Sequence, residues 1–268
     1  MLALWLSLTL AAPPPMPSDA ECKPLPALAT SRFPFQAGEK LDYDIDLLGG
    51  IKIGTVEMEV QPPERIGDEL MLPIRGHAQG DGFVASIGKL KSDATSWLRI
   101  HDLHPFRYRE DYTERSGSYW TDVRFPKAGQ PCRVHFAFGQ PGGNGERTVA
   151  CGNDVLDVLG AFYLVRGLDL QVGQPMCFDL YGSRHVWRIW GTVATRESKT
   201  TPAGKFATLR LSGHAAWLGP REQVLDLSVW LTDDSRHLPV ASVAGFGFGP
   251  VRAALTGMGG PKRNESDR

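Results

Sequence analysis

The sequence lacks an excess of charge of either sign, and it lacks an apolar run long enough to cross a membrane. Its 268 residues carry 29 Lys and Arg against 30 Asp and Glu, a formal net charge of −1 at pH 7. A dedicated nucleic-acid-binding protein would show a clear basic excess. The longest apolar run, Leu2–Ala12, has eleven residues, whereas a transmembrane helix needs about 20. We therefore expect neither a nucleic-acid partner nor a transmembrane span.

The apolar run at the start of the chain predicts export. Leu2–Ala12 has the length of the apolar core of a signal peptide, although no Lys or Arg precedes it. Ser18 and Ala20 are small residues at the spacing of a cleavage site before Glu21. We expect a signal peptide over residues 1–20 and an exported protein, in the periplasm or associated with the outer membrane. The alternative is a buried apolar segment at the N-terminus.

Cysteine is scarce, and its spacing excludes common metal and redox motifs. The four cysteines form no C-x-x-C pair, so neither a zinc ribbon nor a thioredoxin-type site is supported. An even number of cysteines in an exported chain suggests disulfides instead. Lipidation of Cys22 is not favoured, because a lipid-attachment signal needs an apolar residue where Asp19 stands and a small one where Glu21 stands.

Cys132 and Cys151 are predicted to form a disulfide across a β-hairpin. They lie at equal distances from the turn-rich run around Pro141, so they oppose each other if the strands pair without a bulge. Val134 and Val149 continue the same apolar face. The alternative is two buried thiols, if the glycines of the turn shift the register by one residue. The spacing offers no support for a bond between the two remaining cysteines, Cys22 and Cys177.

Glycine and proline are abundant, which argues against a mostly helical fold. Together they make 30 + 20 = 50 of the 268 residues, and both are poor helix formers. Apolar residues from Leu41 to Leu47 alternate with aspartates, which is typical of a half-buried strand. The next strand changes phase at Gly54, where a β-bulge would restore the apolar face. Further strands are predicted over 70–74, 97–100, 106–112, 119–125, 176–181, 185–193, 206–217, 224–232 and 240–248.

One helix is predicted, over Asn153–Val165. Asn153 or Asp154 could cap it, apolar residues recur at intervals of three and four, and Gly167 would end it. The fold class we predict is mainly β, a single curved antiparallel sheet or open barrel with one main α-helix. The domain organisation would be a Pro-rich segment over 21–32, a β-rich domain over 33–258 and a polar disordered tail over 259–268.

Four segments carry a recognisable order of strand, cap and turn patterns. They are FPFQAGEKLDYDIDLLGGIKIGTVEMEV (Phe33–Val60), LDVLGAFYLVRGLDLQVGQ (Leu156–Gln174), TPAGKF (Thr201–Phe206) and VWLTDDSRHLPV (Val229–Val240). In this order they resemble the exported bacterial family catalogued as domain of unknown function 3108, from about Phe33 to Leu255. The resemblance implies a secreted or periplasmic protein built on a curved antiparallel sheet. It implies no activity.

Motifs for catalysis, metals and cofactors are weak. Ser86 lacks the glycine two positions before it that a nucleophile elbow needs. His101 and His104 would point to opposite sides of an extended strand, which does not suit a metal site. We therefore expect no catalytic residue, metal or cofactor. An enzyme of unrecognised, hydrolase-like type remains the alternative; its candidate residues are Asp233, Asp234, Arg236 and His237, for which a simple turn is the competing interpretation.

Tryptophan gives the main indication of a ligand site. Trp187 and Trp190 lie on opposite faces of one predicted strand, and Trp217 lies on the next. One ring of such a strand enters the core, and the other must cover a loop, meet a partner or line an apolar cavity. We take Trp187, Trp190 and Trp217 as the candidate ligand-binding residues, for an apolar small molecule, a lipid or an apolar segment of a partner. Ordinary core packing and a purely structural envelope role are the alternatives, and the sequence leaves the oligomeric state open.

Overall fold

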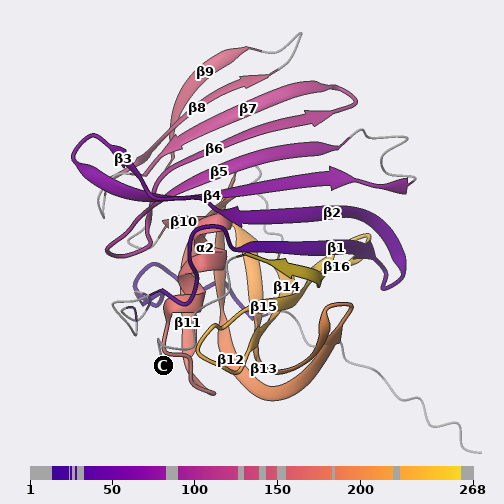
Figure 1. Ribbon diagram of the computed structural model, residues 1–268. Helices are drawn as coiled ribbons and strands as arrows, with labels where there is room; N and C mark the ends of the chain where they lie inside the picture. Colours follow the sequence, from indigo (N-terminus) through magenta and orange to yellow (C-terminus); the bar gives the residue numbers. More distant parts are fainter. Residues whose placement is uncertain are drawn as a thin grey trace, which may run out of the picture.

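The computed structural model describes residues 14–23, 25, 28, 33–82, 90–125, 130–138, 143–149, 155–182, 185–219 and 224–260 (Figure 1). The predicted signal peptide over 1–20 and tail over 259–268 therefore lie largely outside the described residues. In the first half of the chain the strands are β1 (Lys40–Leu47), β2 (Ile51–Val60), β3 (Glu64–Ile66), β4 (Glu69–Gly80), β5 (Lys91–Arg99), β6 (Pro105–Glu114), β7 (Gly117–Arg124), β8 (Cys132–Phe138) and β9 (Asn144–Val149).

The second half of the chain adds the described helix and the remaining strands. They are β10 (Val155–Asp157), α2 (Val158–Leu164) with the 3-10 turn η1 (Val165–Gly167), β11 (Pro175–Gly182), β12 (His185–Thr201), β13 (Gly204–Trp217), β14 (Val224–Thr232), β15 (Pro239–Phe246) and β16 (Gly249–Gly259).

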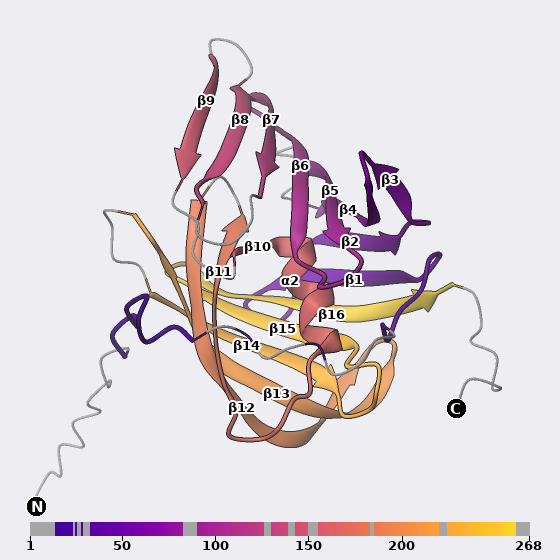
Figure 2. The same cartoon turned by 90° about the vertical axis from the view of Figure 1, so that its left-hand side faces the viewer.

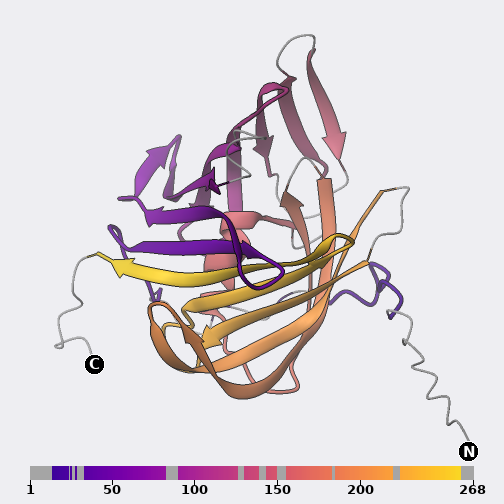
Figure 3. The same cartoon turned by 90° about the vertical axis from the view of Figure 1, so that its right-hand side faces the viewer.

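All described strands join one sheet that does not close. The order is β10-β11-β12-β13-β14-β15-β16-β1-β2-β4-β5-β6-β7-β8-β9, with β3 paired to β4. The sheet curls so that β11–β16 wrap around one side of α2, while β4–β9 fan out on the other side (Figures 1, 2 and 3). This confirms the predicted curved sheet or open barrel with one helix. The pair β10–β11 is parallel, which the antiparallel prediction did not include.

The first two strands form as their side-chain pattern predicts. Leu41 and Tyr43 are buried in β1, whereas the intervening aspartates are not. The register between β1 and β2 shifts after the pair of Ile45 with Gly54, which confirms the bulge. Gly54 is needed there because a side-chain carbon at this position would lie 2.5 Å from the carbonyl oxygen of Gln79. Beyond the bulge, Met58 and Val60 lie on the buried face, whereas Ile51 before it is exposed.

The helix begins later than the sequence predicts. Val155–Asp157 is a buried strand that pairs with β11, so helical residues start only at Val158. Asp157, and not Asn153 or Asp154, is the N-cap, because its carboxylate accepts a hydrogen bond from the N–H of Gly160. Asn153 and Asp154 lie outside the described residues. Gly167 ends the turn η1, as predicted.

The predicted strand over 240–248 was wrong in its boundaries, and the strand after it was not predicted. β15 ends at Phe246, the chain turns, and β16 then pairs with both β15 and β1. Gly249 has a φ of +128° at this reversal, which only glycine adopts readily. The last described strand, β16, therefore lies beside the first, β1, and this pair is in the middle of the sheet.

Candidate ligand pocket between helix α2 and the sheet

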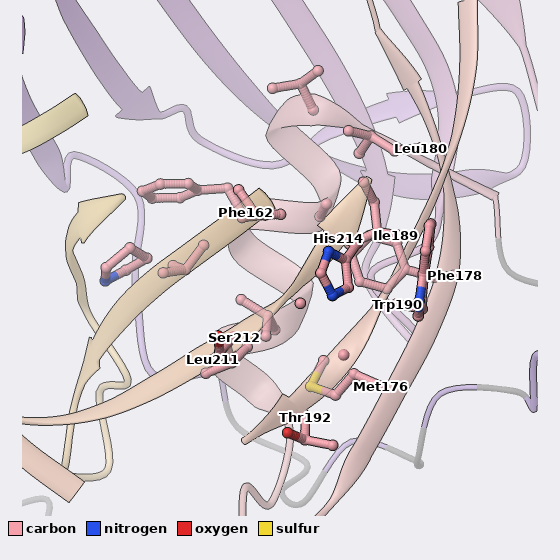
Figure 4. A pocket seen from close by; sticks show the side chains of 18 residues that line it. Phe162, Met176, Phe178, Leu180, Ile189, Trp190, Thr192, Leu211, Ser212 and His214 are labelled. Atoms are coloured by element: carbon pink, nitrogen blue, oxygen red, sulfur yellow. The ribbon is translucent and has the colours of Figure 1, made fainter. Parts of the chain in front are cut away.

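A pocket lies between α2 and strands β11–β14 (Figure 4). About 830 Å³ of space between atoms lies here, and this figure includes the part open to solvent. The helix side is lined by Val158, Ala161, Phe162 and Val165. The apolar side chains on the sheet side are Met176, Phe178, Leu180, Ile189, Leu211, Leu227 and Val229.

The lining is almost entirely apolar. Among the described residues that form it, none is Asp, Glu, Lys or Arg, and the polar side chains are those of Thr192, Ser212 and His214. Nδ1 of His214 lies 3.1 Å from a carboxylate oxygen of Asp226. A charged or strongly polar ligand group inside this pocket would lose its hydration and find few polar partners in return. The pocket is therefore suited to an apolar molecule or segment.

Two glycines on neighbouring strands shape the sheet side of the pocket. Gly191 of β12 pairs with Gly213 of β13. A side-chain carbon at Gly213 would lie 2.1 Å from the carbonyl oxygen of Trp190, and one at Gly191 would lie 2.3 Å from that of Ser212. Consecutive residues on both strands border the pocket. Since neighbouring residues of a strand point to opposite faces, backbone atoms must form part of this wall.

A buried aspartate holds the start of the helix wall. Asp157 is 0% exposed; it accepts hydrogen bonds from Ser96 Oγ of β5 at 2.6 Å and from the N–H of Gly160 at 2.7 Å. Burial raises the pKa of Asp157 to about 6, even though these hydrogen bonds act in the opposite direction. The carboxyl group thus ties α2 to β5 and sets where the wall of the pocket begins.

A buried ion pair holds the other end of the helix. Arg166, in η1, donates to both carboxylate oxygens of Glu39 at 2.6 and 3.0 Å and to the carbonyl oxygen of Arg236 at 3.2 Å. Its guanidinium also lies over the rings of Phe35 and Tyr163, at 5.0 and 5.2 Å. A buried guanidinium with its donors satisfied makes a rigid connection. Both ends of α2 are therefore fixed, which keeps the pocket open between them.

Comparisons with known proteins identify the family but not an activity. The profile described as "Protein of unknown function (DUF3108)" matches residues 42–256, most of the chain. The chain belongs to this family. No curated protein sequence matches that of this DUF3108 protein.

Solved structures resemble the DUF3108 chain to different degrees. A beta-barrel-like protein of domain of unknown function DUF1849 from Brucella abortus has a TM-score of 0.55 and 9% identity, covering 85% of this chain and 99% of that one. A candidate lipoprotein from Parabacteroides distasonis and a candidate exported protein with a YmcC-like fold from Bacteroides fragilis have TM-scores of 0.39 and 0.40. They are 10% and 9% identical, and each match covers 85% of this chain and 98% of the other. At 9% identity the match with the Brucella abortus protein shows a similar fold alone.

The three predicted tryptophans do not form one site in the DUF3108 protein. Trp190 borders the pocket, whereas Trp187 and Trp217 pair with each other across β12 and β13 outside the lining. The register places Trp190 opposite Cys177 and His214, and its ring lies 5.5 Å from that of His214. The ring of Trp217 lies 4.6 Å from that of His185. Of the three, Trp190 is the one whose ligand-binding role remains a prediction with a structural basis.

The hairpin predicted around Pro141 is present as β8 and β9, with a different register. Cys132 is buried and pairs with Val149, two residues away from the symmetric register. A shift of two residues leaves each side chain on its predicted face. Cys151 lies outside the described residues, so the bond between Cys132 and Cys151 stays a prediction. A peptide map of unreduced protein, in which the two fragments are joined, would test it.

The remaining disulfide is the one for which the spacing offered no support. Cys22 and Cys177 are bonded, with Cα atoms 5.2 Å apart and a sequence separation of 155 residues. Sequence spacing could not predict this bond because it depends on where the N-terminal segment lies on the folded sheet.

The candidate residues for an enzyme form a turn. Asp234 accepts hydrogen bonds from the hydroxyl group of Thr232 and from the backbone and side chain of Arg236. Burial raises the pKa of Asp234, but these hydrogen bonds outweigh it and the pKa is lowered. Asp233 binds Arg196 of β12, and His237 faces the carbonyl oxygen of Arg166. These contacts are those of a turn that packs against β12 and η1. No group of three metal-binding side chains occurs in the described part of the chain.

Sequence reasoning missed most of the residues that form the pocket. The helix residues were predicted to form one apolar face, and no role was predicted for Gly191 and Gly213. The available signal was a glycine inside each of two otherwise regular strands, which often marks a close approach of another backbone.

Proposed function

We propose that the protein is an exported, non-enzymatic component of the cell envelope that holds an apolar ligand between α2 and the sheet. The observation that carries this proposal is the pocket of about 830 Å³, which has an apolar lining and both ends of its helix wall fixed. The ligand class is an apolar small molecule, a lipid chain or an apolar segment of a partner.

The disulfide and the N-terminal run support export. A bond between Cys22 and Cys177 persists in an oxidising compartment such as the periplasm, and such bonds are rare in the cytosol. The described residues contain no helix that combines the length and apolar character required to cross a bilayer.

A charged side chain at the mouth of the pocket tests the proposal. Val158 at the start of α2 and Val172 in a loop outside the pocket are both 46% exposed. An environment-sensitive apolar dye should bind the wild-type protein with a dissociation constant of about 1–10 μM. Val158→Glu should weaken binding at least about tenfold, because the carboxylate must lose its hydration when the dye enters. Val172→Glu should leave it unchanged.

The substitution Val158→Glu is compatible with the helix, because a negative charge is favourable at a helix N-terminus. Unfolding of both variants in urea controls for stability. If the folded wild-type protein does not bind the dye, or if both variants bind it equally well, the pocket is not a ligand site. A structural envelope role would then be the better explanation.

A further inference from the structure

The residues just before Cys22 form a hydrogen-bonded turn of their own. The carbonyl oxygen of Ser18 accepts from the N–H groups of Glu21 and Cys22 at 3.1 and 3.0 Å. In return, the carboxylate of Glu21 accepts from both the backbone N–H and the hydroxyl of Ser18, each at 2.8 Å. The contact of the Glu21 carboxylate with the backbone N–H of Ser18 is one half of a capping box, whereas the N–H of Glu21 bonds the carbonyl oxygen and not the hydroxyl of Ser18. The turn holds itself together without help from the sheet.

The same segment is fastened to the sheet at two further points. Cys22 is bonded to Cys177 of β11. Arg188 of β12, whose side chain is 6% exposed, donates from Nη1 to the carbonyl oxygen of Pro17 at 2.9 Å and from Nη2 to Asp19 at 2.5 Å. Its Nε and Nη2 also bind Asp179 at 2.9 and 3.1 Å. Figure 2 shows this segment in indigo beside β11 and β12.

The buried guanidinium makes the contact with Pro17 the important one. A buried arginine needs partners for its N–H groups, and loss of one leaves a donor unsatisfied. The Asp19 side chain is 92% exposed, so its ion pair with Arg188 contributes little stability. Nη1 of Arg188 donates to the carbonyl oxygen of Pro17.

A cut after Ala20 would destroy this arrangement. The small residues Ser18 and Ala20 fit a leader cleavage site by spacing alone, yet in the fold they belong to the turn. Hydrolysis of the bond between Ala20 and Glu21 would separate Ser18 from Glu21. It would also remove Pro17 and Asp19 from Arg188.

We propose that the mature protein keeps the segment Pro17–Cys22, and that any leader is removed by hydrolysis of a peptide bond before Pro17. Cys22 is then the covalent anchor of this segment and not a site of lipid attachment, because its sulfur is already bonded to Cys177. The proposal does not depend on what the pocket binds.

N-terminal sequencing and intact mass of the full chain, recovered from the envelope fraction of a bacterial host, test this directly. The first residue should lie between Met1 and Pro17, and the mass should contain no lipid. A first residue after Pro17, or a lipid on Cys22, would overturn the proposal.

A substitution at the exposed Ala20 distinguishes cleavage before Pro17 from cleavage after Ala20. A leader peptidase needs a small residue directly before the cut. Under the proposal, Ala20→Leu and the control Ala20→Ser both leave the first residue of the mature chain unchanged. If Ala20→Leu alone blocks or shifts processing, the cut follows Ala20 and the proposal is wrong.

Discussion

Helix α2 meets two flanks of the same sheet in opposite ways. Toward β4 and β5 it packs closely, since a side-chain carbon at Gly76 would lie 3.0 Å from Leu159, and one at Gly160 would lie 3.2 Å from Leu98. Toward β12 and β13 the glycines bring two strands together, and the space between them and the helix forms the pocket. On the flank of β4 and β5, glycine lets the helix and the sheet pack closely. On the flank of β12 and β13, glycine lets two strands approach each other, and the space toward the helix stays open.

Alanine substitutions at three glycines should give graded losses of stability. Gly213→Ala should cost about 3 kcal/mol, because the added carbon meets a backbone oxygen that cannot move alone. Gly76→Ala should cost about 1 kcal/mol, since the neighbour is the flexible end of Leu159. Gly247→Ala meets nothing within 4 Å and should change stability by less than about 0.5 kcal/mol. Unfolding in urea measures all three. Equal losses at Gly213 and Gly76 would contradict the contrast between the flanks.

The packed flank should also respond to pH through Asp157. Its folded-state pKa is raised from 3.8 to about 6, so the folded state holds this proton more tightly than the unfolded state does. The contribution of Asp157 to stability therefore falls as pH rises from about 4 to 6, by up to about 3 kcal/mol. Asp157→Asn retains a capping side chain but cannot ionise, and it should gain stability relative to wild type between pH 4 and pH 7.

Asp93 gives a control of opposite sign. A hydrogen bond with His77 holds the pKa of Asp93 below its usual range. The Asp93 carboxylate therefore stabilises the fold above the usual pKa of an aspartate, and the loss of stability caused by Asp93→Asn should disappear as pH falls below that value. Urea unfolding from about pH 3 to pH 7 measures both variants. Parallel pH curves for wild type and Asp157→Asn would show that the Asp157 carboxyl group is not perturbed by burial.

The smallest expected effect distinguishes the tryptophans on the open flank. Trp190 borders the pocket, whereas Trp187 on the same strand does not. Trp190→Ala should weaken binding of an apolar dye by about threefold to fivefold. Trp187→Ala should weaken it less, since Trp187 lies opposite the lining residue Leu180 but does not itself border the pocket. A larger effect from Trp187→Ala would mean that the ligand lies on a different part of the sheet.

Much of the fold could be predicted because β-strands carry a local signal. The alternation in β1 and the phase change at Gly54 predicted a strand and a bulge that the structure confirms. The strand β10 was read as helix because its three residues continue the helical spacing of Leu159 and Phe162. Its pairing with β11, a contact distant in sequence, determines its conformation instead.

The pocket could not be predicted because it depends on which elements meet. Gly191 and Gly213 become significant only when β12 and β13 pair in the observed register. Likewise, the pairing of Cys22 with Cys177 depends on where the N-terminal segment lies on the sheet. The alternation of side chains along a strand places Trp187 and Trp190 on opposite faces of β12. It could not show which of the two residues borders the pocket.

Native mass spectrometry of the protein isolated from its own host tests the central claim most directly. The account predicts a bound apolar molecule, extractable into organic solvent, that accompanies the wild-type protein and the Val172→Glu variant and is lost from Val158→Glu. A folded wild-type protein that carries no such molecule and takes up none from an added lipid extract would contradict it.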